Sequence, residues 1–157
     1  ADCSAWSRGQ GWGLYGYVMM YRFSKDPRYL DHARKIAGFI LNHPNLPEDK
    51  IPYWDFDAPY IPHAKRDASA GAVIASALLE LGQYTQGSEK ESYINNAKDM
   101  IVSLSGEKYK AKLGENGGFL LKHSTGALPS NSEVDVPLIY ADYYYLEALK
   151  RYKDWYL

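Results

Sequence analysis

Residues 67–85 read DASAGAVIASALLELGQYT, and this stretch decides the fold. Small and apolar residues lie on every face of the helix that it predicts, and a helix without a polar face is buried on all sides. Asp67 is its predicted N-cap. The next segment, about residues 88–104, starts with a predicted capping box at 88–91 and carries one apolar stripe. A fully buried helix is therefore followed by a half-buried one.

The same pair of helices is predicted earlier in the chain. Residues 11–23 are apolar almost all round, which again predicts a buried helix. Residues 27–41 are amphipathic, with Asp26 as the predicted N-cap and Pro27 in the first turn. A last aromatic helix, about residues 138–152, resembles the first and third in its composition.

This alternation predicts an all-α fold with two concentric layers of helices. The two amphipathic helices align without gaps, with Ala33 matching Ala97, which indicates a repeated hairpin. Such hairpins build a solenoid or a closed α/α toroid, and the chain is long enough for about half a ring. An open half-ring exposes apolar flanks, so we expect self-association or a missing N-terminal half. Ala1 is not Met, and we expect the chain to begin in mid-protein.

Composition excludes several classes of function. The 157 residues carry 18 Lys+Arg and 19 Asp+Glu, a net charge of −1, which does not favour nucleic acid or an anionic membrane as partner. No apolar run is long enough to span a bilayer. The single cysteine, Cys3, excludes an internal disulfide framework and a cysteine-based zinc site. No two of the four histidines have metal-ligand spacing, and no cofactor motif occurs, so we expect neither a metal nor a cofactor.

Two long loops are predicted at the end of the ring where its cavity opens. Residues 43–66 contain five prolines and the aromatic run PYWDFDAP, which makes this loop stiff. Residues 105–137 contain five glycines around a short extended run at 118–121, which predicts a small strand or hairpin.

The run WSRGQGWG at residues 6–13 carries the main candidates for ligand binding. Arg8 offers a planar fork matched to a carboxylate. Trp6 and Trp12 offer flat apolar faces for stacking, so the run suggests an anionic cyclic ligand. The alternative is an irregular helix start with two core tryptophans. Trp54, in the aromatic run of the first loop, is a further candidate.

Other polar residues are less specific. His123 lies in the glycine-rich loop, from which it could reach a cleft. Ser130 and Ser132 precede the last helix and could hold an anion at its N-terminus, or form a polar turn. Asp55 and Asp57 are interpreted as turn residues. Two further histidines are expected to face solvent, namely His32 and His43.

The runs WSRGQGW, PYWDFDAP, RDASAGAVIASALLEL and NSEVDVPLIYADYYYLEALKRY closely resemble the C-terminal part of the unsaturated glucuronyl hydrolases, glycoside hydrolase family 88. The resemblance implies an (α/α)6 barrel, of which residues 1–157 form the C-terminal portion of a single domain. It also implies a substrate, an oligosaccharide with 4,5-unsaturated uronic acid at its non-reducing end. In this family an aspartate protonates the double bond, water adds, and the hemiketal then rearranges.

The resemblance implies roles for particular residues. Arg8 and Trp12 match the arginine and second tryptophan that contact substrate, and His123, Ser130 and Ser132 are candidates for polar contacts. The two catalytic aspartates of the family lie in its N-terminal half, and neither of their motifs occurs here. The catalytic residues of this chain are therefore unknown, and we expect the pair to lie outside it.

Two other functions stay open at this point. One is an unsaturated rhamnogalacturonyl hydrolase, with the same barrel and chemistry. The other is a non-catalytic helical-repeat module that binds acidic sugars or protein. The compartment is unknown, cytoplasmic or periplasmic, since any targeting segment would precede Ala1.

Overall fold

The computed structural model describes residues 4–157, so Cys3 lies outside the described residues. Within this range the chain is mainly helical, with one small two-stranded sheet. None of the helices in the described range is long and apolar enough to cross a membrane. The elements, in chain order, are α1 (Ser7–Ser24), α2 (Pro27–Leu41), α3 (Ala68–Leu81), α4 (Gly87–Ser105), the 3-10 turn η1 (Asn116–Gly118), β1 (Ser124–Ala127), the 3-10 turn η2 (Leu128–Ser130), β2 (Ser132–Val136) and α5 (Ile139–Tyr156).

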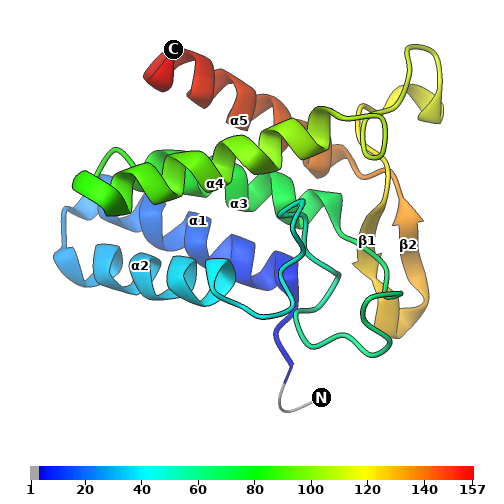
Figure 1. Ribbon diagram of the computed structural model, residues 1–157, viewed down its shortest axis with the longest axis horizontal. Helices are drawn as coiled ribbons and strands as arrows, with labels where there is room; N and C mark the ends of the chain where they lie inside the picture. The colour runs from blue at the N-terminus through cyan, green and yellow to red at the C-terminus, as the bar shows by residue number, and fades with distance from the viewer. Residues whose placement is uncertain (1–3) are drawn as a thin grey trace.

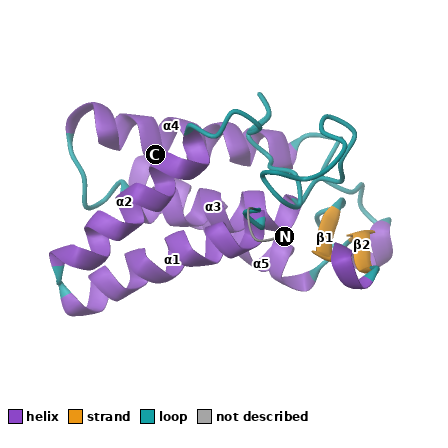
Figure 2. Ribbon diagram, turned by 90° about the horizontal axis from the view of Figure 1, so that it is seen from below, coloured by secondary structure: helices purple, strands orange, loops and turns teal. Residues whose placement is uncertain are grey.

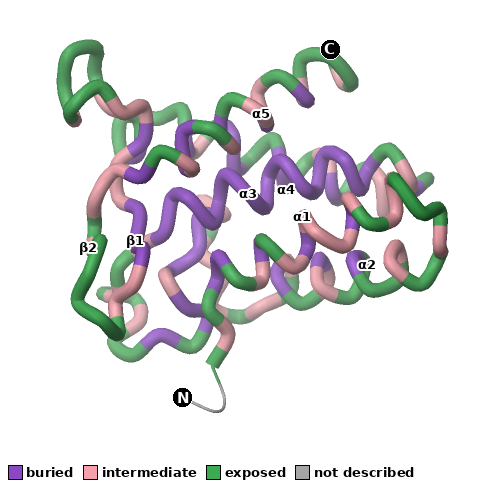
Figure 3. The backbone as a smooth tube through the Cα atoms, turned by 180° about the vertical axis from the view of Figure 1, so that it is seen from behind, coloured by how far each residue is buried: buried purple, intermediate pink, exposed green. Residues whose placement is uncertain are grey.

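Helix α3 is the centre of the arrangement. It packs against α1, α4 and α5, while α2 packs against α1 (Figure 1). Every residue of α3 is buried, and Figure 3 shows this helix as a continuous buried segment. Helices α1, α3 and α5 form one layer, and α2 and α4 cover it. The predicted pair of layers is confirmed, because an all-apolar helix needs neighbours on every side.

The prediction that the first and last helices are buried on all sides is wrong for the described chain. Helix α1 buries one stripe that includes Leu14 and Val18, and it leaves Phe23 77% exposed. Helix α5 leaves Tyr143 and Leu146 more than half exposed. No described segment covers these flanks. Exposed apolar flanks are the expected consequence of an open half-ring.

Two predicted helix starts are confirmed by their caps. The carboxylate of Asp26 accepts a hydrogen bond from the backbone N–H of Arg28 at 3.0 Å, and Pro27 opens α2. The carboxylate of Asp67 accepts one from the backbone N–H of Ser69 at 3.1 Å and caps α3. Each cap satisfies a backbone donor that the helix itself cannot pair.

The predicted capping box at Ser88 is wrong. Helix α4 starts one residue earlier, at Gly87, behind Gln86, which makes no side-chain cap. Gly87 has a φ of 59°, which glycine adopts at little cost, so the chain turns into the helix before the predicted cap. Helix α3 also ends at Leu81 rather than at Thr85.

Both long loops lie at one end of the molecule, beside the first turns of α1, α3 and α5 (Figures 1 and 2). The N–H of Ser7 donates to the carbonyl of Trp54 at 3.1 Å, which joins the start of α1 to the first loop. The predicted strand at 118–121 is reduced to an isolated antiparallel bridge between Lys110 and Leu121, because Gly117 and Gly118 have φ values of 63° and 90° and break the start of the run. The hairpin forms later, from β1 and β2.

Candidate functional site

The side chain of Arg8 joins the start of α1 to α3 and to the β1–β2 hairpin. Its Nη1 donates to Oδ2 of Asp67 at 3.1 Å and to Oγ of Ser69 at 3.3 Å. Nη1 also donates to the carbonyl of Thr125 at 2.7 Å, and Nη2 donates to that of Gly126 at 2.6 Å. Arg8 is buried, and its fork is held by acceptors from three separate segments.

Asp67 is the buried partner of this guanidinium. Complete burial raises the pKa of Asp67, while the hydrogen bond from Ser69 and the charge of Arg8 act in the opposite direction. The sequence identified Asp67 as an N-cap, which is confirmed, but not as the partner of Arg8. No local signal could have found that pairing, since the two residues are 59 positions apart.

Aromatic rings lie beside the guanidinium, and two tryptophans near it are partly exposed. Cζ of Arg8 lies 4.9 Å from the ring centre of Trp6 and 5.3 Å from that of Tyr140. Trp12 packs edge-on against Tyr144, with ring centres 5.0 Å apart. Trp6 is 44% and Trp12 38% exposed, so neither is a core tryptophan. A cation beside half-open indole faces suits a ring-shaped anionic ligand.

Trp54 lies next to Trp6, as part of the first loop. The two indoles line a cavity of about 230 Å³, together with Asp55 and Pro129 of the η2 turn. Asp55 is buried and accepts from the N–H groups of Ala5 at 3.2 Å and of Asp57 at 2.8 Å. Its interpretation as a turn residue is confirmed. The structure therefore brings Trp54 to the same rim as the WSRGQGW run.

His123 does reach a cavity. Its Nδ1 lies 2.6 Å from Oδ1 of Asp135, and with Lys65 and Lys108 it lines a space of about 260 Å³. The hydrogen bond from Lys65 at 2.9 Å and that from His123 lower the pKa of Asp135, although burial opposes this. The cavity is cationic on balance.

Ser130 and Ser132 do not lie at a helix N-terminus, so that prediction is wrong. Ser130 ends the η2 turn and Ser132 begins β2, and both are exposed at the tip of the hairpin. Strand β2 separates them from α5, which begins at Ile139. Their part in substrate binding stays a prediction.

The remaining residues singled out from the sequence are two histidines. His32 is exposed as predicted, but His43 is not, because it packs between the rings of Phe39 and Phe56. His43 is held there by its apolar neighbours, which the sequence next to it does not reveal. No group of three or more His, Cys, Asp or Glu side chains is placed to hold a metal in the described part of the chain.

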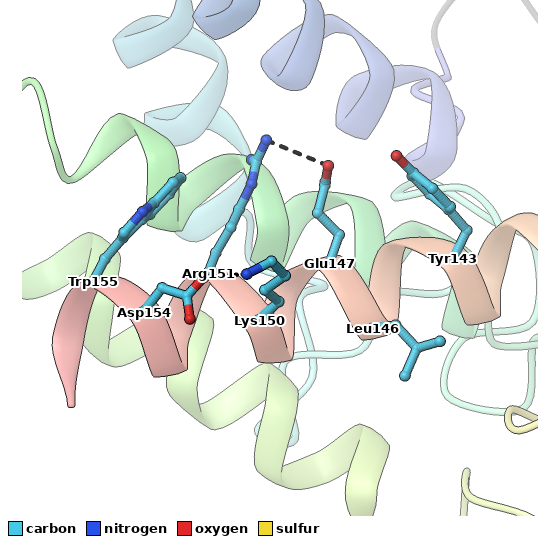
Figure 4. Close-up of a pocket in the computed structure, with 7 residues that line it drawn as sticks. All are labelled: Tyr143, Leu146, Glu147, Lys150, Arg151, Asp154 and Trp155. Atoms are coloured by element: carbon cyan, nitrogen blue, oxygen red, sulfur yellow. Dashed lines mark hydrogen bonds and ion pairs between the residues drawn. The ribbon is translucent and has the colours of Figure 1, made fainter.

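A larger cavity of about 550 Å³ runs along the exposed flank of α5. Figure 4 shows Tyr143, Glu147, Arg151 and Trp155 projecting from one side of the helix, toward α1. Arg151 pairs with Glu147 at 3.4 Å, and a hydroxyl from α1, that of Tyr15, donates to Glu147 at 3.1 Å. Burial raises the pKa of Tyr15 to about 12, despite the charge of Arg151. This polar cluster ties α5 to α1.

The fold and the rim together define a class of protein, a two-layered α/α fold whose loop end brings a guanidinium close to partly exposed indoles. No family model matches the chain. Comparison with solved structures gives the crystal structure of an unsaturated glucuronyl hydrolase specific for heparin, with a TM-score of 0.94 and 56% identity, covering 98% of this chain and 41% of that one. A mutant of the Streptococcus agalactiae unsaturated glucuronyl hydrolase, in complex with dGlcA-GalNAc6S, matches with a TM-score of 0.89 and 38% identity over all of this chain and 42% of that one.

A curated relative gives the same result. The unsaturated glucuronyl hydrolase of Formosa agariphila is 49% identical over 148 residues, which are 94% of this chain and 36% of that protein. The chain thus corresponds in sequence and fold to a segment of the unsaturated glucuronyl hydrolases, and it spans about two fifths of their length. The family resemblance and the α/α toroid fold are confirmed.

Proposed function

We propose that this chain forms the substrate-binding mouth of an enzyme that removes 4,5-unsaturated uronic acid from lyase-generated oligosaccharides by hydrating the double bond. The observation that carries the proposal is the match over 98% of the chain to a solved unsaturated glucuronyl hydrolase at 56% identity. The glucuronyl names of these relatives favour this function over a rhamnogalacturonyl hydrolase and over a non-catalytic module.

In this proposal the WSRGQGW run holds the unsaturated sugar. The exposed faces of Trp6 and Trp12 stack against the ring, and the charge of Arg8 attracts the uronate carboxylate. Nη1 of Arg8 is taken up by protein acceptors, and one N–H of Nη2 donates to the carbonyl of Gly126. The carboxylate therefore meets the second N–H of Nη2 and the N–H of Nε. We further propose that His123, Ser130 and Ser132 make polar contacts with the substrate and that Trp54 offers a stacking face.

Neither of the two buried aspartates beside the WSRGQGW run is placed to act as the acid in the chemical step. Protonating the double bond needs a carboxylic acid that can reach the sugar. Asp67 is fully buried against Arg8, and Asp55 is buried under backbone N–H groups. We therefore propose that the catalytic aspartates come from outside this chain, which supplies recognition.

Calorimetry with an unsaturated disaccharide tests the proposal, with loss of the alkene's ultraviolet absorbance followed in parallel. We expect binding without turnover. Trp12→Ala should weaken binding by roughly fivefold, because stacking on one indole is worth about 1 kcal/mol. Trp155→Ala is the matched control, since Trp155 is 41% exposed but lies near the far end of α5. Equal effects of both substitutions, or no binding by the wild type, would refute the assigned site, and turnover would refute the assignment of the acid.

A further inference from the structure

The polar cluster between α1 and α5 continues as a set of aromatic contacts that includes Trp12. Tyr144 of α5 contacts two rings of α1, with its ring centre 5.0 Å from that of Trp12 and 5.3 Å from that of Tyr15. Both contacts are edge-to-face, with interplanar angles of 74° and 78°, which is a favoured geometry for aromatic pairs. The orientation of Tyr15 therefore affects that of Trp12 through Tyr144.

The hydroxyl of Tyr15 is held by two side chains of α5. It donates to Oε1 of Glu147 at 3.1 Å and accepts from Nη2 of Arg151 at 3.3 Å. Burial raises the pKa of Tyr15 to about 12, so the hydroxyl keeps its proton and remains a donor at neutral pH. These two hydrogen bonds at the tip of the side chain, together with Tyr144 against its ring, fix the orientation of Tyr15.

The carboxylate of Glu147 is fixed in turn from α3. Its Oε2 accepts a hydrogen bond from Oγ of Ser76, and its Oε1 lies 3.4 Å from Arg151 (Figure 4). Arg151 donates to the carbonyl of Ser76 at 2.8 Å and pairs with Glu80 at 3.0 Å. The side chain of Glu147 is 20% exposed, and those of its anchors Arg151 and Glu80 are 8% and 4% exposed. These contacts direct the carboxylate of Glu147 toward Tyr15.

The negative charge of Glu147 does not by itself favour an acidic ligand. A carboxylate in the same cluster of helices repels a uronate, so attraction gives no reason for a glutamate at this position. Its hydrogen bond to Tyr15 gives one. Trp12 is 38% exposed, and an indole that is already ordered loses less conformational freedom when a ligand binds.

We propose that Glu147 is a positioning residue, which orders the sugar-stacking indole of Trp12 through Tyr15 and Tyr144. The inference rests on the proposed function, because Trp12 is the side chain that meets the sugar there. Glu147 itself is assigned no contact with the substrate and no part in the chemical step.

Calorimetry with an unsaturated disaccharide tests the assignment with two variants of Glu147. Glu147→Ala should bind roughly threefold more weakly than the wild type, the cost of ordering a side chain on binding. Glu147→Gln should retain wild-type affinity, because its amide oxygen accepts from Tyr15 and its amide NH2 donates to the hydroxyl of Ser76. Asp154→Ala is the matched control and should leave the affinity unchanged, since it removes an exposed carboxylate from the same helix.

The same substitution in a Trp12→Ala background shows whether Glu147 acts through the indole. W12A/E147A should bind no more weakly than W12A alone. An equal loss in both backgrounds would mean that Glu147 only supports the fold, and it would overturn the proposal. Tighter binding by both Glu147 variants would assign the effect to charge, and equally weak binding by both would rule out the hydrogen bond to Tyr15 as its cause.

Fluorine NMR of protein labelled with 5-fluorotryptophan gives a readout that does not depend on the ligand. The resonance of Trp12, assigned by its loss in Trp12→Phe, should move or broaden in Glu147→Ala and in Tyr15→Phe but not in Asp154→Ala. Tyr15→Phe removes only the hydroxyl, so it carries the test if Glu147→Ala lowers the unfolding temperature. An unmoved resonance would overturn the proposal. A moved resonance in a protein that does not bind the disaccharide would refute the proposed function and leave the link between Glu147 and Trp12 intact.

Discussion

Replacing Asp67 tests the central contact of the proposed mouth. Asp67 is fully buried, accepts from Nη1 of Arg8 at 3.1 Å, and caps α3 through the N–H of Ser69. Asp67→Ala removes both interactions at once. The side chain of Arg8 is itself only 8% exposed, so the substitution leaves a buried positive charge without its carboxylate.

The expected loss follows from these two contacts. Breaking a buried ion pair by removing one partner costs about 3–5 kcal/mol. Loss of a helix N-cap adds about 1 kcal/mol. Asp67→Ala should therefore lower the free energy of unfolding by roughly 4–6 kcal/mol, which for a chain of this size corresponds to a fall in Tm of about 10 °C or more. Asp67→Asn should cost less, because an amide oxygen can still cap the helix.

Urea unfolding followed by circular dichroism measures these values. Asp99→Ala, at an exposed position of α4, is the control and should change stability by less than about 0.5 kcal/mol. The double variant R8M/D67N completes a cycle, and the coupling between the two sites should exceed about 1 kcal/mol. The reasoning is refuted if Asp67→Ala behaves like the control, or if the effects at Arg8 and Asp67 simply add.

Three further predictions concern packing, pH and association. Gly71→Ala should destabilise the protein by about 1–3 kcal/mol in urea unfolding, because the new Cβ would lie 2.8 Å from Cδ1 of the buried Ile51. Gly16→Ala is the control and should be neutral or stabilising, because nothing lies within 4 Å of its new Cβ. Equal effects of the two substitutions would contradict this packing. Burial opposes ionisation of Asp49, but hydrogen bonds from Lys108 and Arg66 outweigh burial and lower the pKa of Asp49. The contribution of ionised Asp49 to stability is therefore present above the ordinary Asp pKa of about 4, and it is lost as the pH falls through the lower pKa of the folded state. Acid titration of unfolding should therefore be flatter below about pH 4 in Asp49→Asn than in the wild type, and identical curves would refute it. Leu146→Glu, on the exposed flank of α5, should shift sedimentation of concentrated protein toward the monomer, and an unchanged distribution would argue against association through this flank.

Much of the fold follows from local sequence. The all-apolar run of α3 forces it into the centre, and single apolar stripes predict covering helices, because helical periodicity and burial are read within a few turns. Asp26 and Asp67 act as N-caps for equally local reasons. The errors have local causes as well, since Gly87 and Gly118 adopt positive φ values that displaced a helix start and a strand.

The candidate site also has one part that local sequence predicts and another that depends on the tertiary structure. The sequence by itself placed Arg8 between Trp6 and Trp12 in one short run, with Arg8 and Trp12 four residues apart at the start of one helix. Only the tertiary structure decided what holds them. The acceptors for Arg8 come from positions 59 and 117 residues further along the chain, and the cavity beside His123 joins Lys65 to Lys108. Hydrogen bonds and charge pairs depend on distance in space, and that distance is set by how the helices pack rather than by any short stretch of sequence.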